Sequence, residues 1–316
     1  MNKIPLVVIA GPTASGKTRA GVLLAKELGG EVVSADSMQI YKSMTISTAK
    51  PTDDEMQGIK HHLIDFAQPD TSFSVADYLT MAREVIDDIT SRGKLPIVVG
   101  GTGLYISSLV DNIKLDDTCS STEIRDELYA IAKEKGNHAL WEMLNDTDPE
   151  TASAVHENNL SRVVRALEVY RMTGEKLSVH KERRKAEESP YNVCMIGLNF
   201  HDREKLYDRI NKRVDIMLEK GLVEEAKEFF SQPLRYTANQ AIGIKELKPY
   251  LDGDDTLENC IEKIKMESRR YAKRQLTWFR RDERINWVYL DDEELLTSDE
   301  ELTKILKSFV VKSSIL

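Results

Sequence analysis

The 316-residue chain contains only three cysteines and no long apolar run. Cys119, Cys194 and Cys260 are far apart, odd in number and without CxxC spacing, which argues against a disulfide framework and against a cysteine-rich zinc site. The first apolar run, residues 5–10, is shorter than the roughly 7–15 residues of a signal-peptide core. No run approaches the roughly 18 apolar residues that a membrane span needs. We therefore expect a cytoplasmic protein with no membrane partner.

The overall composition is that of a globular protein. Hydrophobic residues make up 41% of the chain and charged residues 31%, which excludes a mostly disordered chain and suits one large domain or two modest ones. The 44 basic and 53 acidic residues give a net charge of -9. Taken as a bulk figure, this charge argues against a nucleic-acid partner, but it does not say where the charges lie.

Short β-branched runs alternate with helical stretches along most of the chain. Strands are expected at residues 5–9, 31–34, 62–65, 95–99, 193–198 and 285–290. Continuous apolar strands separated by helices are typical of an α/β fold with a parallel sheet covered by helices on both faces. The interval 114–190 shows no strand pattern, which predicts an inserted all-helical domain. The phosphate-loop core would then consist of residues 1–113 and 191–316, C-terminal helices included.

Some helix ends can also be predicted. Ser120 and Glu123 have the spacing of a capping box before an apolar helix face. A long helix is expected at about residues 256–281. The acidic tail after residue 291 is expected to be peripheral.

The most specific motif is Gly11-Pro-Thr-Ala-Ser-Gly-Lys-Thr18, which fits the phosphate-loop pattern G-x-x-x-x-G-K-[ST] between a strand and a helix. Its backbone N–H groups and the following helix N-terminus favour an anion. Lys17 adds a positive charge, and the Thr18 hydroxyl can bind Mg²⁺. The expected strand at 95–99 runs into glycines and not into an acidic Walker-B residue, which disfavours motor and switch NTPases. The motif leaves open a nucleoside triphosphate or another diphosphate ester.

Two further segments follow expected strands, where ligands of open α/β sheets bind. Asp36 comes after the second strand and could accept a proton or hold Mg²⁺ through water, while Ser37 and Gln39 could bond a base edge. Each could equally be an ordinary loop residue. Gly100-Gly101-Thr102-Gly103 follows the fourth strand and permits either a close approach to a ligand or a simple turn. The histidines at 61, 62 and 180 lack metal-ligand spacing.

Two basic stretches interrupt the acidic chain. Residues 160–185 hold 8 basic and 3 acidic residues, and residues 263–284 hold 9 basic and 3 acidic residues, leaving a net charge of −20 for the rest. In the second stretch Tyr271 and Trp278 lie between arginines, a pattern that suits a phosphodiester backbone with exposed bases. The alternative is a solvated helix face.

Together these motifs resemble the bacterial tRNA dimethylallyltransferase family, also called tRNA isopentenyltransferase. The resemblance covers nearly the whole chain. It rests on the phosphate loop and on the segments Asp36-Ser-Met-Gln-Ile-Tyr41, Gly100-Gly-Thr-Gly-Leu-Tyr105, Arg162-x-x-Arg-Ala-Leu-Glu168, Arg213-Val-Asp215, Ala241-Ile-Gly243 and Tyr271-Ala-Lys-Arg-Gln-Leu-Thr-Trp-Phe-Arg280. Ile244 departs from the Tyr that many relatives have, and the zinc finger of eukaryotic relatives is missing.

The resemblance implies transfer of a dimethylallyl group from dimethylallyl diphosphate to N6 of the adenosine 3′ of the anticodon, in tRNAs that read codons beginning with U. It implies Mg²⁺ as cofactor and the anticodon stem-loop of tRNA as partner, and we expect a monomer. The implied catalytic residues are Lys17, Thr18, Asp36, Thr102 and Arg213. The implied diphosphate site consists of Gly11, Thr13, Ala14, Ser15, Gly16, Lys17 and Thr18, with Thr18 as the metal ligand. The implied tRNA contacts are Asp36, Ser37, Met38, Gln39, Thr102, Arg162, Arg165, Arg274 and Arg281.

Three other functions remain open at this stage. A small-molecule kinase would use the same loop without a nucleic-acid surface. An enzyme that prenylates free adenine nucleotides could also lack that surface. A nucleotide-gated RNA-binding module would bind RNA without turnover.

Overall fold

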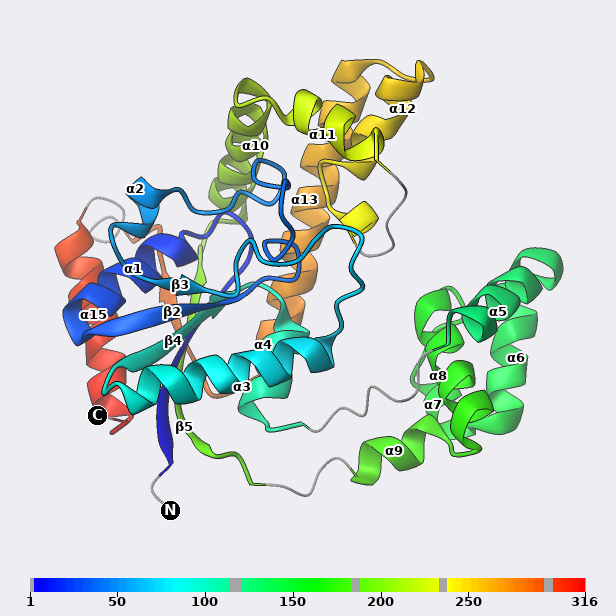
Figure 1. Ribbon diagram of the computed structural model, residues 1–316, viewed down its shortest axis with the longest axis horizontal. Helices are drawn as coiled ribbons and strands as arrows, with labels where there is room; N and C mark the ends of the chain where they lie inside the picture. The colour runs from blue at the N-terminus through cyan, green and yellow to red at the C-terminus, as the bar shows by residue number, and fades with distance from the viewer. Residues whose placement is uncertain (1–2, 114–120, 184–187, 233–237, 293–297, 316) are drawn as a thin grey trace. The chain divides into compact units, whose positions relative to one another are not determined.

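The structure is a computed structural model that describes residues 3–113, 121–183, 188–232, 238–292 and 298–315 (Figure 1). Six parallel strands form one sheet in the order β3-β2-β4-β1-β5-β6. Their bounds are β1 (Ile4–Ala10), β2 (Gly30–Ala35), β3 (His61–His62), β4 (Leu95–Gly100), β5 (Tyr191–Asn199) and β6 (Ile285–Tyr289). The expected parallel sheet is confirmed, although β3 is shorter than the run 62–65 and begins one residue earlier.

Helices cover both faces of the sheet. Val7 and Ile9 of β1 pack on the face that carries α1 (Lys17–Leu28) and α15 (Asp299–Lys312). Figure 1 shows α3 (Val75–Ser91) and α4 (Gly103–Val110) together on the other face. Stacking of Tyr78 on Tyr105, with ring centroids 4.1 Å apart, joins these two helices. Two-sided burial explains why the strands read as continuous apolar runs.

A second core lies beyond the carboxyl ends of the strands. It combines the segment after β2, which includes Ile40 and Met44, with α10, α11 and α13. The elements of this region are α10 (Arg203–Glu219), α11 (Leu222–Phe230), α12 (Lys248–Asp252), α13 (Leu257–Phe279) and two 3-10 turns at Ala238–Gln240 and Lys245–Leu247. The short helix α2 (Asp53–Met56) instead contacts α1. Helix α13 also reaches the sheet core through Ala272 and Leu276.

The C-terminal helix contradicts the expected peripheral tail. In α15 the side chains of Leu302, Leu306 and Val310 are buried in the same core as β1 and α1. Ion pairs Arg19–Asp299 and Lys307–Glu27, both 2.5 Å, join α15 to α1. The prediction was wrong because an acidic first turn hid an apolar stripe at positions i, i+4 and i+8.

The chain divides into two compact units, residues 1–111 with 189–316 and residues 112–188, against expected boundaries of 114 and 190 for the insertion. The second unit is helical in its described part, with α5 (Thr122–Lys135), α6 (Asn137–Thr147), α7 (Pro149–Ser153), α8 (Leu160–Thr173) and α9 (Leu177–Arg183). Ser121 caps α5 by accepting from Ile124 N at 3.3 Å. The expected cap, Ser120, lies outside the described residues. Among the helices described in both units, none combines the length and apolarity of a membrane span.

Candidate functional site

The phosphate-loop motif forms a tight turn between β1 and α1. Gly16, in the left-handed region with φ 79°, immediately precedes α1. A Cβ at Gly11 would lie 2.7 Å from Leu198 O, so the loop passes close to β5 only with glycine there. Ser15 Oγ is buried and finds no hydrogen-bond partner among the described residues. A hydroxyl in this position can donate to a phosphate oxygen.

Two helices from the C-terminal half hold this loop. Thr13 N donates to Gln275 Oε1 of α13 at 2.8 Å, and Arg209 Nε of α10 donates to Ala14 O at 3.0 Å. Gln275 Nε2 in turn donates to Gly101 O at 2.9 Å. The buried amide of Gln275 therefore links the phosphate loop to the glycine segment after β4.

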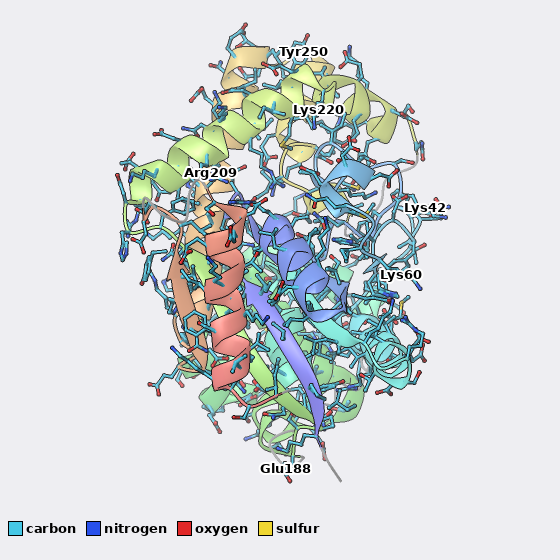
Figure 2. All side chains as sticks on the ribbon, turned by 90° about the vertical axis from the view of Figure 1, so that its left-hand side faces the viewer. Lys42, Lys60, Glu188, Arg209, Lys220 and Tyr250 are labelled. Carbon is cyan, nitrogen blue, oxygen red and sulfur yellow. The ribbon has the colours of Figure 1, made fainter. Side chains whose placement is uncertain are left out.

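The loop opens onto a cleft of about 660 Å³. Its lining includes nine of the residues predicted from the sequence, namely Thr13, Ala14, Ser15, Gly16, Lys17, Thr18, Asp36, Gln39 and Arg213. It also includes five basic residues that the motifs did not single out, Arg19, Lys50, Arg209, Lys212 and Lys220. Figure 2 labels Arg209 on α10 and Lys220 just after the end of that helix. The helical spacing could have indicated two of the five, Arg209 and Lys212, since they share a helix face with Arg213.

The charges of the cleft favour an anionic ligand. Burial, and next the neighbouring Arg213, lower the pKa of Lys17 to about 7, although Asp36 acts in the opposite direction. Burial likewise lowers the pKa of Arg213, against the charges of Asp36 and Glu55. A Lys17 charge that burial and Arg213 disfavour is stabilised when an anion binds beside it.

One carboxylate oxygen of Asp36 is bonded within its own loop. Its Oδ1 accepts from Met38 N at 2.9 Å and from Gln39 N at 3.3 Å. These backbone bonds show that Asp36 is a turn residue, and its place in the cleft lining shows that it can also face a ligand. Among the described residues both bonds use Oδ1, so Oδ2 is the oxygen that can meet the ligand.

Thr102 lies beside Asp36 but outside the cleft lining. Its Oγ1 accepts from Ser37 N at 3.1 Å. Tyr271, which does line the cleft, lies close to Thr102. Burial, and then the charge of Asp36, raise the pKa of Tyr271. Thr102, Ser37, Tyr271 and Asp36 therefore form one polar cluster next to the cleft.

The structure gives the glycines after β4 a packing role. A Cβ at Gly101 would lie 2.2 Å from Gln275 Nε2, and one at Gly103 would lie 2.4 Å from the Trp278 ring. These glycines admit α13, so the close approach is to a helix.

Two side chains of the segment 36–39 make contacts within the protein itself. Gln39 Nε2 donates to Thr48 O and Ala49 O, both at 3.2 Å. Met38 packs against the second core. The amide nitrogen of Gln39 is therefore engaged with the chain itself and does not point to a base edge.

The basic stretch on α13 separates into two groups. Some members are paired at 2.7–2.8 Å, through Lys265–Asp215, Arg270–Glu267 and Arg284–Asp111. The other group is exposed and has no ion pair with an acidic residue in the described part of the chain; it consists of Lys263, Lys273, Arg274, Arg280 and Arg281. Arg274 lies over the Tyr271 ring at 5.6 Å, and Arg281 lines a second hollow of about 490 Å³ with Trp278. Only this unpaired group remains a candidate for binding nucleic acid.

Within the helical unit, Arg162 is exposed and Arg165 is half-buried on α8. The fully buried carboxylate of Glu168 accepts from Arg165 and from Arg125 of α5, both at 2.8 Å. Arg125 was not predicted, because its proximity to Arg165 depends on how α5 and α8 pack. Part of the first basic stretch, residues 184–187, lies outside the described residues.

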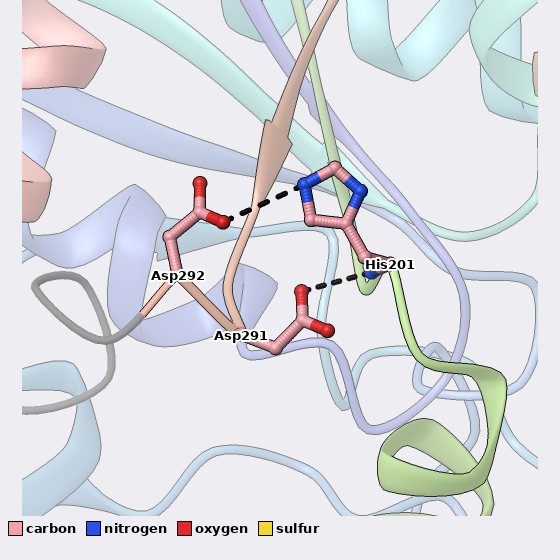
Figure 3. A group of neighbouring side chains, drawn as sticks. All are labelled: His201, Asp291 and Asp292. Carbon is pink, nitrogen blue, oxygen red and sulfur yellow. Dashed lines mark hydrogen bonds and ion pairs between the residues drawn. The ribbon is translucent and has the colours of Figure 1, made fainter.

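The structure offers two places to consider for a metal ion. Thr18 and Asp36 line the cleft and provide the hard oxygen ligands that Mg²⁺ prefers. His201, Asp291 and Asp292 also lie close together (Figure 3). There both Asp291 oxygens already accept backbone bonds, from His201 N and Asp202 N at 2.8 Å, which anchor the start of α10. The second cluster is therefore a structural clamp.

Comparison with known proteins gives one consistent result. Residues 39–282 match the IPP transferase family. The tRNA dimethylallyltransferase of Acetivibrio thermocellus is 49% identical over 307 residues, covering 96% of this chain and 97% of that protein, and that of Halalkalibacterium halodurans is 48% identical, covering 92% of each. The solved tRNA isopentenylpyrophosphate transferase of Bacillus halodurans aligns with TM-score 0.72 at 45% identity, covering 99% of this chain and 98% of its own. A eukaryotic dimethylallyltransferase acting on tRNA aligns with TM-score 0.80 at 30% identity, covering 98% and 80%.

Proposed function

The chain belongs to the IPP transferase family, and on this premise we propose that it transfers a dimethylallyl group to tRNA. The observation that carries the proposal is a single cleft that joins the phosphate loop, Arg213 and Asp36. The basic side chains suit the diphosphate of dimethylallyl diphosphate. Ile64, Ile216 and Met217 of the same lining suit its apolar five-carbon group.

We propose as acceptor the exocyclic N6 of the adenosine 3′ of the anticodon, in tRNAs that read codons beginning with U. The base must leave its stack to reach the cleft. Two groups of side chains supply contacts of the kind that hold an RNA backbone. The first is the unpaired Arg274 and Arg281 beside Tyr271 and Trp278. The second, in the helical unit, is Arg162 with Arg165 and Arg125. A cytoplasmic monomer fits this proposal.

In the proposed reaction, N6 attacks the allylic carbon, a C–N bond forms, and the C–O bond to the diphosphate breaks with its electron pair. Asp36 Oδ2 accepts the N6 proton as the C–N bond forms. The amine needs this help because its lone pair is delocalised into the ring, which makes it a poor nucleophile. The cluster of Ser37, Thr102 and Tyr271 orients the flipped nucleotide of the tRNA. The departing diphosphate is stabilised by the loop N–H groups, Ser15, Lys17 and Arg213.

The residues present also fit a Mg²⁺ cofactor. Thr18 would hold it together with diphosphate oxygens, since Mg²⁺ is usually bound through one or two protein ligands and substrate phosphates. When bound, it would neutralise charge on the leaving diphosphate.

The test is a transfer assay with labelled dimethylallyl diphosphate, Mg²⁺ and unmodified tRNA. Label should enter tRNA without ATP. Separate reactions contain AMP as acceptor or labelled ATP with candidate metabolites. Label in AMP but not in tRNA would indicate a nucleotide prenyltransferase, phosphate transfer from ATP would indicate a kinase, and RNA binding without turnover would indicate a binding module.

A further inference from the structure

One wall of the diphosphate cleft is a short loop, residues 44–50, that follows the segment after β2. Thr45, Ile46, Ala49 and Lys50 of this loop line the cleft. In Figure 1 the blue chain between β2 and α2 lies beside α10 and α13. The loop contains no strand and only a turn of its own, so other elements must fix its position.

The backbone of the 44–50 loop curls like the first turn of a helix. Ala49 N donates to Ile46 O and Lys50 N donates to Thr45 O, both at 3.0 Å. The first N–H groups of such a turn have no acceptor within it and need one from outside. The groups in this position are Ile46 N and Ser47 N.

Glu225 of α11 supplies that acceptor for both groups. Its Oε2 accepts from Ile46 N at 2.7 Å and its Oε1 accepts from Ser47 N at 2.8 Å. Such bonds to a charged carboxylate contribute more than bonds between neutral groups. In the described part of the chain Glu225 is not itself among the cleft-lining residues, although it is bonded directly to one of them.

The other end of the loop contacts groups that face the ligand. Gln39 Nε2 donates to Thr48 O and Ala49 O, and Arg213 Nη2 lies 3.5 Å from Thr48 O. The loop therefore connects Glu225 to Arg213. Displacing it would move both the cleft wall and the carbonyl beside the Arg213 guanidinium.

We propose that Glu225 is a positioning residue for the diphosphate site, acting through the 44–50 loop on Ile46 and Arg213. This inference rests on the proposed function for the identity of the ligand. Loss of Glu225 weakens diphosphate binding, while the tRNA surfaces on α13 and the helical unit keep their contacts.

The test compares Glu225→Gln with Glu224→Gln, its exposed neighbour with the same change of charge. For each variant, calorimetry measures the Kd of inorganic diphosphate, and the transfer assay measures KM for dimethylallyl diphosphate, KM for tRNA and kcat. We expect Glu225→Gln to raise the diphosphate Kd and the prenyl-diphosphate KM about tenfold. The neutral amide keeps one acceptor oxygen, so the loop loses one of its two hydrogen bonds to the charged carboxylate. The KM for tRNA should stay within twofold, and Glu224→Gln should match the wild type.

A merely structural role would lower the melting temperature and the active fraction, and so kcat, without changing either diphosphate constant. That result, or equal constants for the two variants, overturns the proposal. If Glu225→Gln does not fold, Glu225→Asp replaces it with the same expectation, because a shorter carboxylate cannot reach both N–H groups. If the wild type transfers no label to tRNA, the proposed function fails, whereas the diphosphate Kd values still test Glu225.

Discussion

Gln275, near the end of a long helix, accepts a hydrogen bond from the backbone N–H of Thr13 in the phosphate loop at 2.8 Å. The two residues are 262 positions apart in the chain. Because the same amide donates to Gly101 O, α13 fixes the loop and the glycine segment relative to each other. The helix that carries basic side chains on its surface therefore also shapes the diphosphate site.

Gln275→Ala should weaken both the fold and the site. It leaves the partly buried N–H of Thr13 and the buried carbonyl of Gly101 without partners, which costs about 2–3 kcal/mol of the free energy of unfolding. We also expect the diphosphate Kd to rise about tenfold or more. Urea unfolding and calorimetry measure these quantities. The control is Thr277→Ala on the same helix, whose exposed hydroxyl bonds only to Lys273 O within α13. If Gln275→Ala behaves like this control, the link has no energetic role.

Lys17 predicts a pH dependence of diphosphate binding. Because its pKa is lowered to about 7, the free protein loses the Lys17 charge as the pH rises through 7. Binding at pH 8 should therefore take up as much as about one proton, and above pH 7 the Kd should rise by up to tenfold per pH unit. Calorimetry in buffers of different ionisation enthalpy measures the uptake.

The control for this prediction is Lys17→Arg, because arginine stays charged throughout this range. Its diphosphate Kd should be nearly independent of pH between 7 and 9, whatever its absolute value. Wild-type protein that shows the same flat profile would contradict a lowered pKa of Lys17.

Asp36→Asn separates the turn role of Asp36 from its proposed chemical role. The asparagine oxygen can still accept from Met38 N and Gln39 N, so the loop should keep its shape. Without a proton acceptor, kcat should fall about 10²–10⁴-fold while the diphosphate Kd changes by only a few-fold. Single-turnover transfer and calorimetry provide the two measurements. A variant with near-normal kcat would exclude Asp36 as the base.

Two unpaired arginines, Arg274 on α13 and Arg281 just after it, should contribute to the salt dependence of tRNA binding. Replacing Arg274 and Arg281 by Gln should weaken binding and make the slope of log K against log salt shallower by up to about 2. Filter binding between 50 and 300 mM salt measures the slope. The control is Arg270→Gln, whose guanidinium already pairs with Glu267 at 2.7 Å. Equal slopes for all proteins would mean that this face is merely solvated.

Much of the architecture could be predicted from the sequence because it depends on local interactions. Apolar runs predicted the parallel sheet, and the phosphate-loop pattern predicted the turn between β1 and α1, since glycine spacing and helix initiation involve neighbours in the chain. The net charge of -9 does not show the two basic stretches, which become visible when the charges are counted segment by segment. One prediction was wrong because an acidic first turn masked the apolar stripe of α15. The cap of α5 is Ser121, one residue after the predicted Ser120.

The contacts that shape the site came from tertiary packing. Gln275 meets Thr13, Glu225 meets Ile46, and Arg125 meets Glu168 across long sequence separations. The glycines at 101 and 103 fitted either a ligand contact or a simple turn, and packing assigns them to the approach of α13. A sequence shows which side chains can donate, accept or carry charge. Which of them satisfy one another, and which are left facing a ligand, depends on the distances that the folded chain imposes.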